Sequence, residues 1–294
     1  MHRHRFATIG NFDGVHAGHR HLLRELKRKA RACGLKPAAF VLTTHPLSVI
    51  APERVPPRLS SSARRLVLVE AEGVEAIPLH FDEQIRSLTS KEFMAKIADE
   101  FGVKGLMIGY DHKFGSDRLS TFADYVRQGE ELGIHVTEAP ELHGHSSSAI
   151  RKALLRGDVS AAAEMLGYHY RLSGRVVHGM HLGTRIGFPT ANMQPEEAGM
   201  LIPANGVYAT TVRIEGHSEP LPAVTNIGVR PTVATEGAPR SIETHIPGFT
   251  EDIYDRPISL DFIDRIRDEQ RFSSLEELKQ QLARDVAEAI THNL

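Results

Sequence analysis

The sequence predicts two different folds in one chain: an α/β domain with a doubly wound parallel sheet, then an antiparallel sheet or small barrel. Up to about residue 168, short apolar runs alternate with amphipathic helical patterns, which is typical of βαβ units. Beyond that point apolar residues recur with period two between proline and glycine turns, which is typical of antiparallel strands. The 294 residues, 41% of them hydrophobic, suffice for two ordinary cores. We place the domains at residues 1–170 and 171–294.

The first domain is expected to alternate strands and helices in a regular order. Strands are predicted at residues 6–10, 38–42, 76–81, 103–110 and 134–139, and helices at residues 19–34, 60–73, 89–102, 121–133, 146–157 and 159–167. Gly34 stands where a C-cap glycine belongs, and Thr89 with Glu92 has the spacing of a capping box. Ligands of doubly wound sheets bind beyond the carboxyl ends of the strands, so the loop after the first strand is the first candidate site.

The second domain is expected to contain antiparallel strands and a helix at its end. The clearest strands are predicted at residues 206–214, 241–246 and 257–266. In the second of these, Glu243 lies on the face opposite to Ile242 and Thr244, which we assign to the core. Ser273 and Glu276 have capping-box spacing at the start of the final helix. The apolar stripe of that helix comprises Leu275, Leu278, Leu282 and Val286.

Composition and charge exclude several classes of protein. The formal net charge of −2 argues against nonspecific electrostatic binding of nucleic acid by the protein as a whole. The single cysteine, Cys33, excludes an intrachain disulfide framework and fits a reducing compartment. We find no stretch apolar enough for a signal peptide or a membrane span. We therefore expect a cytoplasmic protein with no nucleic-acid or membrane partner, whose oligomeric state the sequence leaves unknown.

The stretch GNFDGVHAGH, residues 10–19, joins the first strand to the first helix. A helix N-terminus offers unpaired N–H donors and partial positive charge, which suit a phosphate, and glycines let an anion come close. His16 and His19 are three residues apart, so both can point into the same space and donate hydrogen bonds to a phosphate that gains charge. Asp13 lies close enough to act on a phosphate or a metal ion, and spacing does not decide its role.

Other interpretations of these segments stay open. His16, His19 and His21 could bind zinc, although no cysteine or carboxylate completes the set locally. The glycines could also form a tight turn with solvated histidines. Three serines at residues 146–148 are good helix caps and phosphate donors, and Arg151 one turn inside can clamp a triphosphate, but a capped helix with a surface arginine would look the same.

These segments resemble the adenylyltransferase module of bacterial bifunctional riboflavin kinase/FAD synthetases, a Rossmann-like nucleotidylyltransferase domain. GNFDGVHAGH resembles its GxFDGxHxGH signature, TTHP (43–46) its TFxPHP strand end, GYDHKFG (109–115) its GxDFxFG loop, and SSSAIRK (146–152) its ISSTxIR motif. This sequence departs from the family pattern at His112, Ser148 and Ala149. The resemblance implies catalytic roles for His16, His19 and Arg151, flavin contacts from Asp111 and Phe114, and phosphate contacts from Gly10, Phe12, Asp13, Gly14, Gly18, Ser146, Ser147 and Ser148.

The stretch GMHLGTRIGFPTAN, residues 179–192, is a second candidate nucleotide site. Its glycines are Gly179, Gly183 and Gly187. It lacks the GK[ST] of a Walker A motif, but its backbone amides can still wrap a nucleotide and Arg185 can neutralise phosphate charge. Thr190 and Asn192 offer neutral oxygens, which suit Mg²⁺ bridged to phosphates. A glycine-rich hairpin in a β-domain is the alternative.

Glu243 is the candidate catalytic carboxylate of the second domain. A carboxylate on the open face of a barrel strand can accept the proton of an alcohol that is being phosphorylated. A solvated glutamate on an edge strand fits the same pattern, and spacing alone does not separate the two interpretations.

The second half resembles the riboflavin kinase module of the same family. The matching segments are GRVVHGMHLGTRIGFPTAN, PANGVYA, TNIGVRPT, IETHI and IRDEQRFSSLEEL, in the family's order. The resemblance implies a six-stranded antiparallel barrel with a C-terminal helix. It also implies that Thr190 and Asn192 hold MgATP and that Glu243 is the catalytic base. The flavin-side residues that it implies are Arg267, Glu269 and Phe272.

Together the two resemblances imply a bifunctional enzyme of flavin synthesis. It would phosphorylate riboflavin to FMN with ATP, and then transfer AMP from a second ATP to FMN, giving FAD and pyrophosphate. Mg²⁺ is the expected cofactor, and riboflavin, FMN, FAD and ATP are the expected ligands. The alternatives are a monofunctional riboflavin kinase with an inactive adenylyltransferase-like domain, and a flavin or nucleotide sensor without turnover.

Overall fold

The computed structural model describes residues 4–109, 113–117, 121–139, 146–179, 183, 186–229 and 240–292. The chain divides into two compact units, the first made of residues 1–56 and 60–146 and the second of residues 57–59 and 147–294. Helices α7 (Ser147–Leu155) and α8 (Val159–Leu166) therefore belong to the second unit, whereas the sequence pattern assigned them to the first domain. As a division between two activities, the boundary at residues 170 and 171 stays a prediction.

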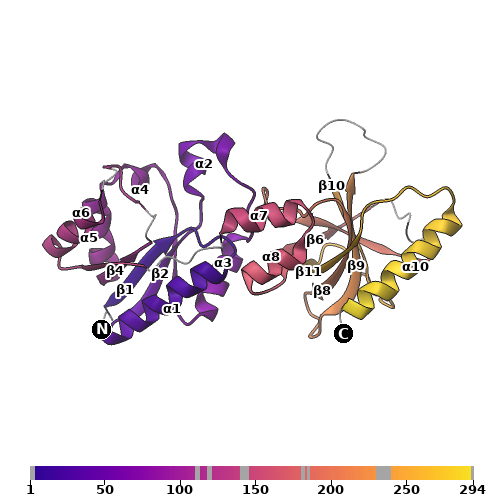
Figure 1. The fold of residues 1–294 in the computed structure, drawn as a ribbon, viewed down its shortest axis with the longest axis horizontal. Helices are drawn as coiled ribbons and strands as arrows, with labels where there is room; N and C mark the ends of the chain where they lie inside the picture. Colours follow the sequence, from indigo (N-terminus) through magenta and orange to yellow (C-terminus); the bar gives the residue numbers. More distant parts are fainter. Residues whose placement is uncertain are drawn as a thin grey trace. The chain divides into compact units, whose positions relative to one another are not determined.

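The first unit is built on a parallel five-stranded sheet (Figure 1). Its strands are β1 (Arg5–Gly10), β2 (Lys36–Leu42), β3 (Glu75–Leu79), β4 (Val103–Ile108) and β5 (His135–Glu138). They lie in the order β3-β2-β1-β4-β5, so the chain starts in the middle and winds outward in both directions. This is the predicted doubly wound sheet, and the order reverses at β1, next to the first candidate loop.

Helices alternate with these strands along the chain. They are α1 (Ala17–Ala32), α2 (Pro46–Ile50), α3 (Ser62–Ala71), α4 (Glu83–Ser87), α5 (Ser90–Phe101) and α6 (Phe122–Glu131), with a 3₁₀ turn η1 (Pro52–Arg54). The predicted capping box at α5 is present, since Thr89 Oγ1 accepts from the Glu92 amide at 3.2 Å and Glu92 Oε2 accepts from the Thr89 amide at 2.8 Å. The sequence missed α2 and α4, because five residues are too few to establish a helical period.

The described strands of the second unit close a six-stranded antiparallel barrel. They are β6 (Tyr170–Val177), β7 (Thr190–Pro195), β8 (Gly206–Ile214), β9 (Leu221–Val229), β10 (Arg240–His245) and β11 (Pro257–Arg267), in the order β10-β7-β6-β11-β8-β9. Helix α10 (Leu275–His292) follows the last strand. The barrel with a C-terminal helix is therefore confirmed.

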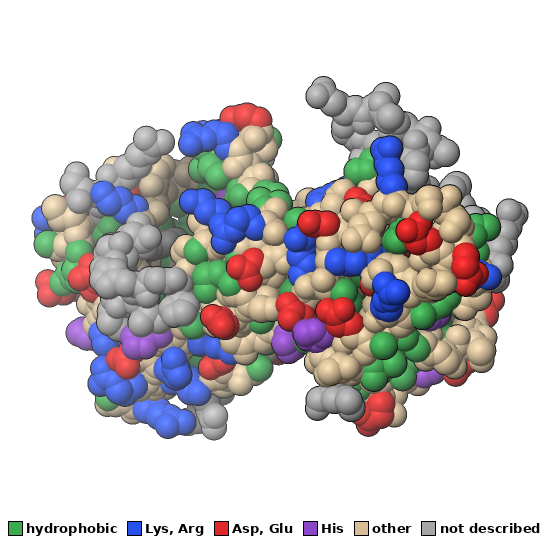
Figure 2. Space-filling view, turned by 45° about the vertical axis from the view of Figure 1, so that its right-hand side comes forward, with side chains coloured by type: hydrophobic (Ala, Val, Ile, Leu, Met, Phe, Trp, Pro, Cys, Tyr) green, Lys and Arg blue, Asp and Glu red, His purple; other side chains and the backbone are tan. Residues whose placement is uncertain are grey.

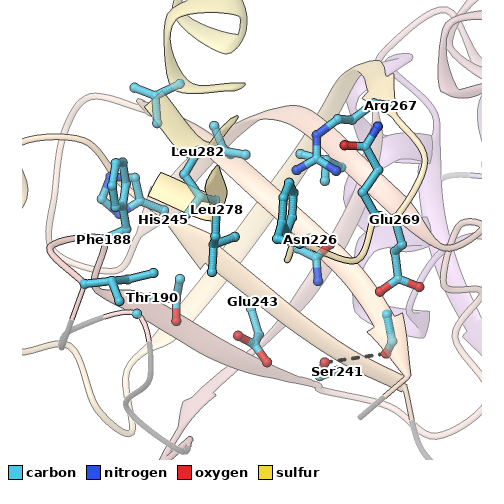
Figure 3. A pocket seen from close by; sticks show the side chains of 18 of the residues that line it. Phe188, Thr190, Asn226, Ser241, Glu243, His245, Arg267, Glu269, Leu278 and Leu282 are labelled. Carbon is cyan, nitrogen blue, oxygen red and sulfur yellow. Dashed lines mark hydrogen bonds between the residues drawn. The ribbon is translucent and has the colours of Figure 1, made fainter. Parts of the chain in front are cut away.

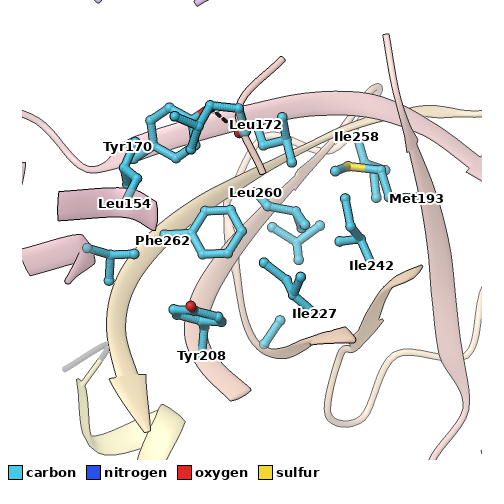
Figure 4. Close-up of a cluster of buried hydrophobic side chains, with 14 of the residues drawn as sticks. Leu154, Tyr170, Leu172, Met193, Tyr208, Ile227, Ile242, Ile258, Leu260 and Phe262 are labelled. Carbon is cyan, nitrogen blue, oxygen red and sulfur yellow. Dashed lines mark hydrogen bonds between the residues drawn. The ribbon is translucent and has the colours of Figure 1, made fainter. Parts of the chain in front are cut away.

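Alternating residues of these strands fill the barrel interior (Figure 4). Leu260 and Phe262 are fully buried on β11, and Ile242 is buried on β10, as the period-two pattern predicts. Leu154 brings α7 into the same cluster, which explains why that helix belongs to this unit. The Tyr170 hydroxyl satisfies its polar end by donating to the Leu201 carbonyl at 2.6 Å.

The start of α10 corrects one prediction. The cap is formed by Ser274, whose Oγ accepts from the Glu277 amide at 3.2 Å, and not by the predicted pair of Ser273 and Glu276. The Glu277 carboxylate accepts from the Ser273 hydroxyl at 2.7 Å. The shift by one residue leaves Leu275 60% exposed, so it does not belong to the apolar stripe.

The described residues on the face drawn in Figure 2 form no patch of a single charge. On the side drawn in Figure 2, lysine and arginine side chains are interspersed with aspartate and glutamate, in agreement with the net charge of −2. Among the helices that the structure describes, none is both long and apolar enough to cross a bilayer.

Leu260→Ala is expected to destabilise the barrel by about 2–5 kcal/mol, because it removes a fully buried side chain and leaves a cavity. Leu275→Ala removes the same atoms from a 60% exposed position and should change stability by less than about 0.5 kcal/mol. The urea midpoint of the barrel, followed by circular dichroism, measures both. Equal shifts of the two variants would contradict the assigned core.

Candidate functional site

The first candidate loop runs from the end of β1 to the start of α1 in an unusual backbone conformation. Phe12 and Val15 have positive φ angles of 49° and 36°, and Gly14 has φ of 80°. Positive φ is costly for a β-branched residue such as Val15 and persists only where surrounding contacts hold it. Such strain concentrates at functional loops, so the backbone itself marks this segment as a site.

A buried polar pair holds the loop in place. Asp13 is only 3% exposed, and its Oδ1 accepts from the Ser60 amide at 3.1 Å. The Ser60 hydroxyl in turn accepts from the Gly14 amide at 2.9 Å. These bonds indicate that Asp13 fixes the loop to the start of the α3 segment. Its contact with a phosphate, which the sequence predicts, stays a prediction.

The fully buried Arg65 of α3 ties the same loop to the ends of two strands. Its Nη1 donates to the Asn11 carbonyl at 2.9 Å, to Asn11 Oδ1 at 2.6 Å and to the Leu42 carbonyl at 2.8 Å. A cation with neutral acceptors keeps much of its positive field, which favours an anion at this edge of the sheet. The sequence did not single out Arg65, because its position inside a helix looks like that of any surface arginine.

The two histidines of the loop converge as their spacing predicts. The rings of His16 and His19 stack with centroids 3.8 Å apart, and the Phe12 ring lies 5.2 Å from His19. Desolvation, and secondly the nearby His16, hold the pKa of His19 well below its usual value, so its imidazole is neutral at neutral pH. The buried Nδ1 of His19 has no hydrogen-bond partner among the described residues. A neutral ring with an unused nitrogen suits hydrogen bonding to a ligand.

The glycines and neighbours of the loop fit this geometry. Gly10 ends β1, and a Cβ there would lie 3.1 Å from the Phe12 ring. Gly18 lies in the first turn of α1. Within the described part of the chain, no group of three or more histidine, cysteine or acidic side chains could hold a metal ion, which gives the zinc interpretation no support.

The other segments predicted for this site have separate positions. Asp111 and His112 lie outside the described residues. Phe114 packs against the Tyr125 ring at 4.8 Å, and the Tyr125 hydroxyl donates to the Phe114 carbonyl at 2.9 Å. These contacts place Phe114 at the edge of the core of the first unit, and its flavin contact stays a prediction.

The serine-rich segment begins α7, as predicted. Ser146 ends the first unit, while Ser147, Ser148 and Ala149 open the helix in the second. Arg151 lies one turn inside and its Nε donates to the Pro57 carbonyl at 2.6 Å. That these residues act together with His16 and His19 stays a prediction.

The candidate site of the barrel unit is a cavity of about 390 Å³ on the outer face of β7, β10 and β9, beside α10 (Figure 3). It collects most of the residues that the sequence predicted for the kinase module. Its lining includes Gly183, Thr190, Asn192, Glu243, Arg267, Glu269 and Phe272, together with Phe188, Asn226, Ser241, His245, Leu278, Leu282 and Val286.

Strand register places Glu243 between two amides. Glu243 of β10 lies directly opposite Asn192 of β7 and directly opposite Asn226 of β9. Residues paired in this way have Cβ atoms about 5 Å apart, and all three side chains line the cavity. No described residue donates a hydrogen bond to the Glu243 carboxylate, so it is available to a ligand.

A second row of the same strands carries Thr190 opposite His245. Nδ1 of His245 donates to the Pro189 carbonyl at 2.7 Å, and its ring packs edge-on against Phe188 at 5.3 Å. These contacts fix the chain just before Thr190. Thr190 and Asn192 are two residues apart on β7, so both oxygens face the cavity.

The glycines of the second loop are needed for close approach. A Cβ on Gly179 would overlap the Asn192 side chain, and one on Gly183 would overlap the Phe188 carbonyl. Gly187 adopts a φ of 86°, which L-residues rarely adopt. Arg185 lies outside the described residues, so its predicted phosphate contact is not tested.

Two of the flavin-side residues, Arg267 and Glu269, lie on the side of the cavity away from Thr190 in Figure 3, with Glu243 between them and Thr190. Glu269 accepts from the Asn205 side-chain amide at 3.0 Å and covers Gly228 closely enough to leave no room for a Cβ there. The guanidinium of Arg267 lies 5.8 Å from the centre of the Phe272 ring. Most of the sequence-predicted kinase residues that the structure describes thus line one cavity, whereas Gly179 and Gly187 are not among its lining residues.

Sequence reasoning missed Asn226 and His245. Asn226 is part of the segment TNIGVRPT, and His245 of IETHI, but single polar residues in strands give no signal without knowledge of the facing strand. A smaller groove of about 220 Å³ was also missed. It shares Thr190 with the large cavity and is otherwise lined by residues such as Pro189, Phe249 and Tyr254.

Comparisons with known proteins cover nearly the whole chain. The family model described as FAD synthetase matches residues 1–152, and the one described as riboflavin kinase matches residues 166–292. A Pseudomonas fluorescens protein named bifunctional riboflavin kinase/FMN adenylyltransferase is 40% identical over 294 residues, covering 98% of this chain and 93% of the relative. An Escherichia coli K12 protein of the same name is 39% identical, covering 95% and 89%.

A solved structure from Streptococcus pneumoniae resembles the chain over both units. It has a TM-score of 0.83 and 32% sequence identity, with 99% of this chain and 94% of that chain covered. It is described as a macrolide-efflux protein, a description that differs from the flavin-related names of the curated relatives.

The depressed pKa of His19 predicts acid sensitivity of the first unit. Below about pH 6.5 the unfolded chain binds a proton at this histidine while the folded unit does not, so stability is complete above that pH and falls as the pH decreases. The limiting slope is about 1.4 kcal/mol per pH unit for one proton. His19→Gln should lose this component when urea midpoints at pH 7.5 and 5.5 are compared, whereas His135→Gln, at an exposed position of the same unit, should keep it.

Proposed function

The chain belongs to the bifunctional riboflavin kinase/FMN adenylyltransferase family, and from this premise we propose how its residues divide the two reactions. It phosphorylates riboflavin to FMN with ATP, and it adenylylates FMN to FAD with release of pyrophosphate. The barrel unit carries the first reaction and the α/β unit the second. Both reactions consume ATP, which supports a cytoplasmic location.

The observation that best supports the kinase reaction is that Glu243 lies between Asn192 and Asn226 on neighbouring strands in the barrel cavity. Glu243 accepts the proton of the ribityl 5′-hydroxyl as that oxygen attacks the γ-phosphorus of ATP. One P–O bond forms to riboflavin, and the bond to the ADP oxygen breaks. The carboxylate suits this task because no described residue already donates to it.

The donor set beside Glu243 fits a magnesium ion that arrives with ATP. Thr190 Oγ1 and Asn192 Oδ1 are two neutral oxygens on one strand face, too few to retain Mg²⁺ without phosphate ligands. We therefore assign them to MgATP. The bound ion supplies positive charge to the phosphate oxygens during transfer.

The large cavity and the smaller groove adjoin each other, which supports separate binding sites for riboflavin and ATP. The large cavity has an aromatic and aliphatic end formed by residues such as Phe272 and Leu278, which suits the isoalloxazine ring. The smaller groove meets it at Thr190 and suits the rest of the nucleotide. In this arrangement the γ-phosphate lies at Thr190, between the cavity and the groove and next to Glu243.

The strained loop of the first unit is proposed to bind the ATP phosphates of the adenylyl transfer. His16 and His19 donate hydrogen bonds to the α-phosphate as it gains charge, and the N-terminus of α1 adds unpaired amides. The family resemblance also implies phosphate contacts from Ser147 and Arg151. No covalent intermediate is needed, since positioned donors support an in-line displacement.

Single substitutions should separate the two reactions. His19→Ala is expected to abolish FAD formation while FMN formation continues. Glu243→Gln should slow FMN formation by about 10²- to 10⁴-fold while FAD still forms from supplied FMN. Chromatography of flavins after incubation with riboflavin or FMN and MgATP measures both products over time.

The same assay decides between the alternatives. FMN without FAD from the unsubstituted protein would indicate a monofunctional kinase, and binding of flavin without turnover a sensor. Loss of both reactions in either folded variant would contradict the division of labour.

Asn226→Ala tests the residue that the sequence did not single out. Asn226 lies directly opposite Glu243 and lines the same cavity, so its amide can hold the riboflavin hydroxyl or a phosphate oxygen beside the base, and removing it should slow FMN formation. We expect kcat to fall roughly tenfold or more. FAD formation from supplied FMN should be unchanged in this variant. An unchanged kcat for FMN formation in the folded variant would show that Asn226 has no role in this reaction.

A further inference from the structure

A buried ion pair connects the end of β11 to the middle of α10. Arg267 Nε donates to Asp285 Oδ1 at 2.9 Å, and its Nη2 donates to Asp285 Oδ2 at 2.6 Å. The two side chains are 14% and 1% exposed. Gln281 also donates to Asp285 Oδ1, at 2.9 Å, so one carboxylate oxygen receives two bonds. A paired, well-hydrogen-bonded charge of this kind fixes the geometry of both elements.

The arginine of this pair lines the kinase cavity, whereas the aspartate does not. Arg267 also donates through Nη1 to the Asp268 carbonyl at 2.9 Å, so protein groups hold three of its nitrogens. Its planar guanidinium is thereby locked beside Phe272, 5.8 Å from the ring centre. Without Asp285, the guanidinium would keep the backbone acceptor but lose the bidentate one.

The same pair sets the position of the apolar side of α10. Leu278, Leu282 and Val286 project from α10 into the cavity, and Asp285 lies next to Val286 in the chain. Val286 also packs on the cluster around Val207, Val224 and Ala289, where α10 meets the outer face of the barrel. The wall that faces a flat aromatic ligand is thus made of Phe272 and α10, and the ion pair is the polar link between them.

We propose that Asp285 is a positioning residue for riboflavin in the kinase reaction, acting through Arg267 to hold Phe272 and the apolar face of α10 around the isoalloxazine ring. The inference rests on the proposed function of the cavity. Asp285 touches neither ATP nor the reacting atoms, because it lies outside the lining and beyond Arg267. Its loss should therefore weaken flavin binding more than it slows phosphoryl transfer.

The barrel offers a matched control for the loss of a buried carboxylate. Asp261 forms a bidentate pair with Arg171, at 2.6 and 2.7 Å, and is 10% exposed. It belongs to β11, the same strand as Arg267, but does not line the cavity. Asp261→Asn removes a comparable charge pair from the same unit with no link to α10.

The test compares Asp285→Asn with Asp261→Asn in the full chain. For Asp285→Asn we expect the KM for riboflavin to rise roughly tenfold or more, with kcat and the KM for ATP within about twofold of the unsubstituted protein. A riboflavin fluorescence titration should show the same loss of affinity without turnover. Asp261→Asn should leave the KM for riboflavin unchanged, although both variants lower the thermal midpoint.

Each result of this comparison either supports or overturns the proposed role of Asp285. A riboflavin KM that stays unchanged in folded Asp285→Asn, or rises equally in Asp261→Asn, overturns the inference and leaves the pair a stabilising contact only. A fall in kcat with both KM values unchanged also overturns it. If Asp285→Asn does not fold, Asp285→Glu carries the same comparison, since it keeps the charge but displaces the carboxylate by one methylene. Failure of the unsubstituted protein to form FMN would instead overturn the proposed function.

Discussion

Side-chain alternation in a closed barrel is the constraint on which the proposed kinase site depends. Successive residues of a strand point to opposite sides, and the interior of a small barrel is filled by side chains. Ile242 and Thr244 are buried inside, so Glu243 between them must face outward. The proposed catalytic and ligand-binding residues therefore lie on the outer surface of β7, β10 and β9, and Leu278, Leu282 and Val286 of α10 complete the lining of the cavity there.

The barrel interior also accommodates polar groups without exposing them. The hydroxyls of Thr210, Thr225 and Thr244 form a chain across three neighbouring strands, with oxygen separations of 2.8 and 3.0 Å. Each buried hydroxyl thus has a partner, which avoids the cost of an unsatisfied group. Thr244 is part of this chain and also lines the smaller groove, so the core and the candidate nucleotide site share a well-ordered strand.

The two units meet a similar chemical demand in different ways. In the first unit, a strained loop and a helix N-terminus present amides and two stacked imidazoles. Hydrogen bonds of the buried Asp13 and Arg65 hold this loop in place. In the second, Thr190 and Asn192 present side-chain oxygens on a rigid strand. Amides and neutral imidazoles bind phosphate oxygens directly, whereas neutral oxygens require a cation between them and the phosphate. The two sets of donors therefore suit the two phosphate reactions that we propose for the two units.

The sequence by itself determined the two periodicities, the capping box at Thr89 and the convergence of His16 and His19, because these depend on residues a few positions apart. It placed the cap of α10 one residue too early, since Ser273 and Ser274 satisfy the same local pattern. Only the tertiary structure decided that α7 and α8 join the barrel core and that Asn226 faces Glu243. The pairing of Asp285 with Arg267 was likewise decided only by the tertiary structure. These contacts join residues that are distant in the sequence. Strand register and long-range packing bring them together, and no local spacing pattern encodes either.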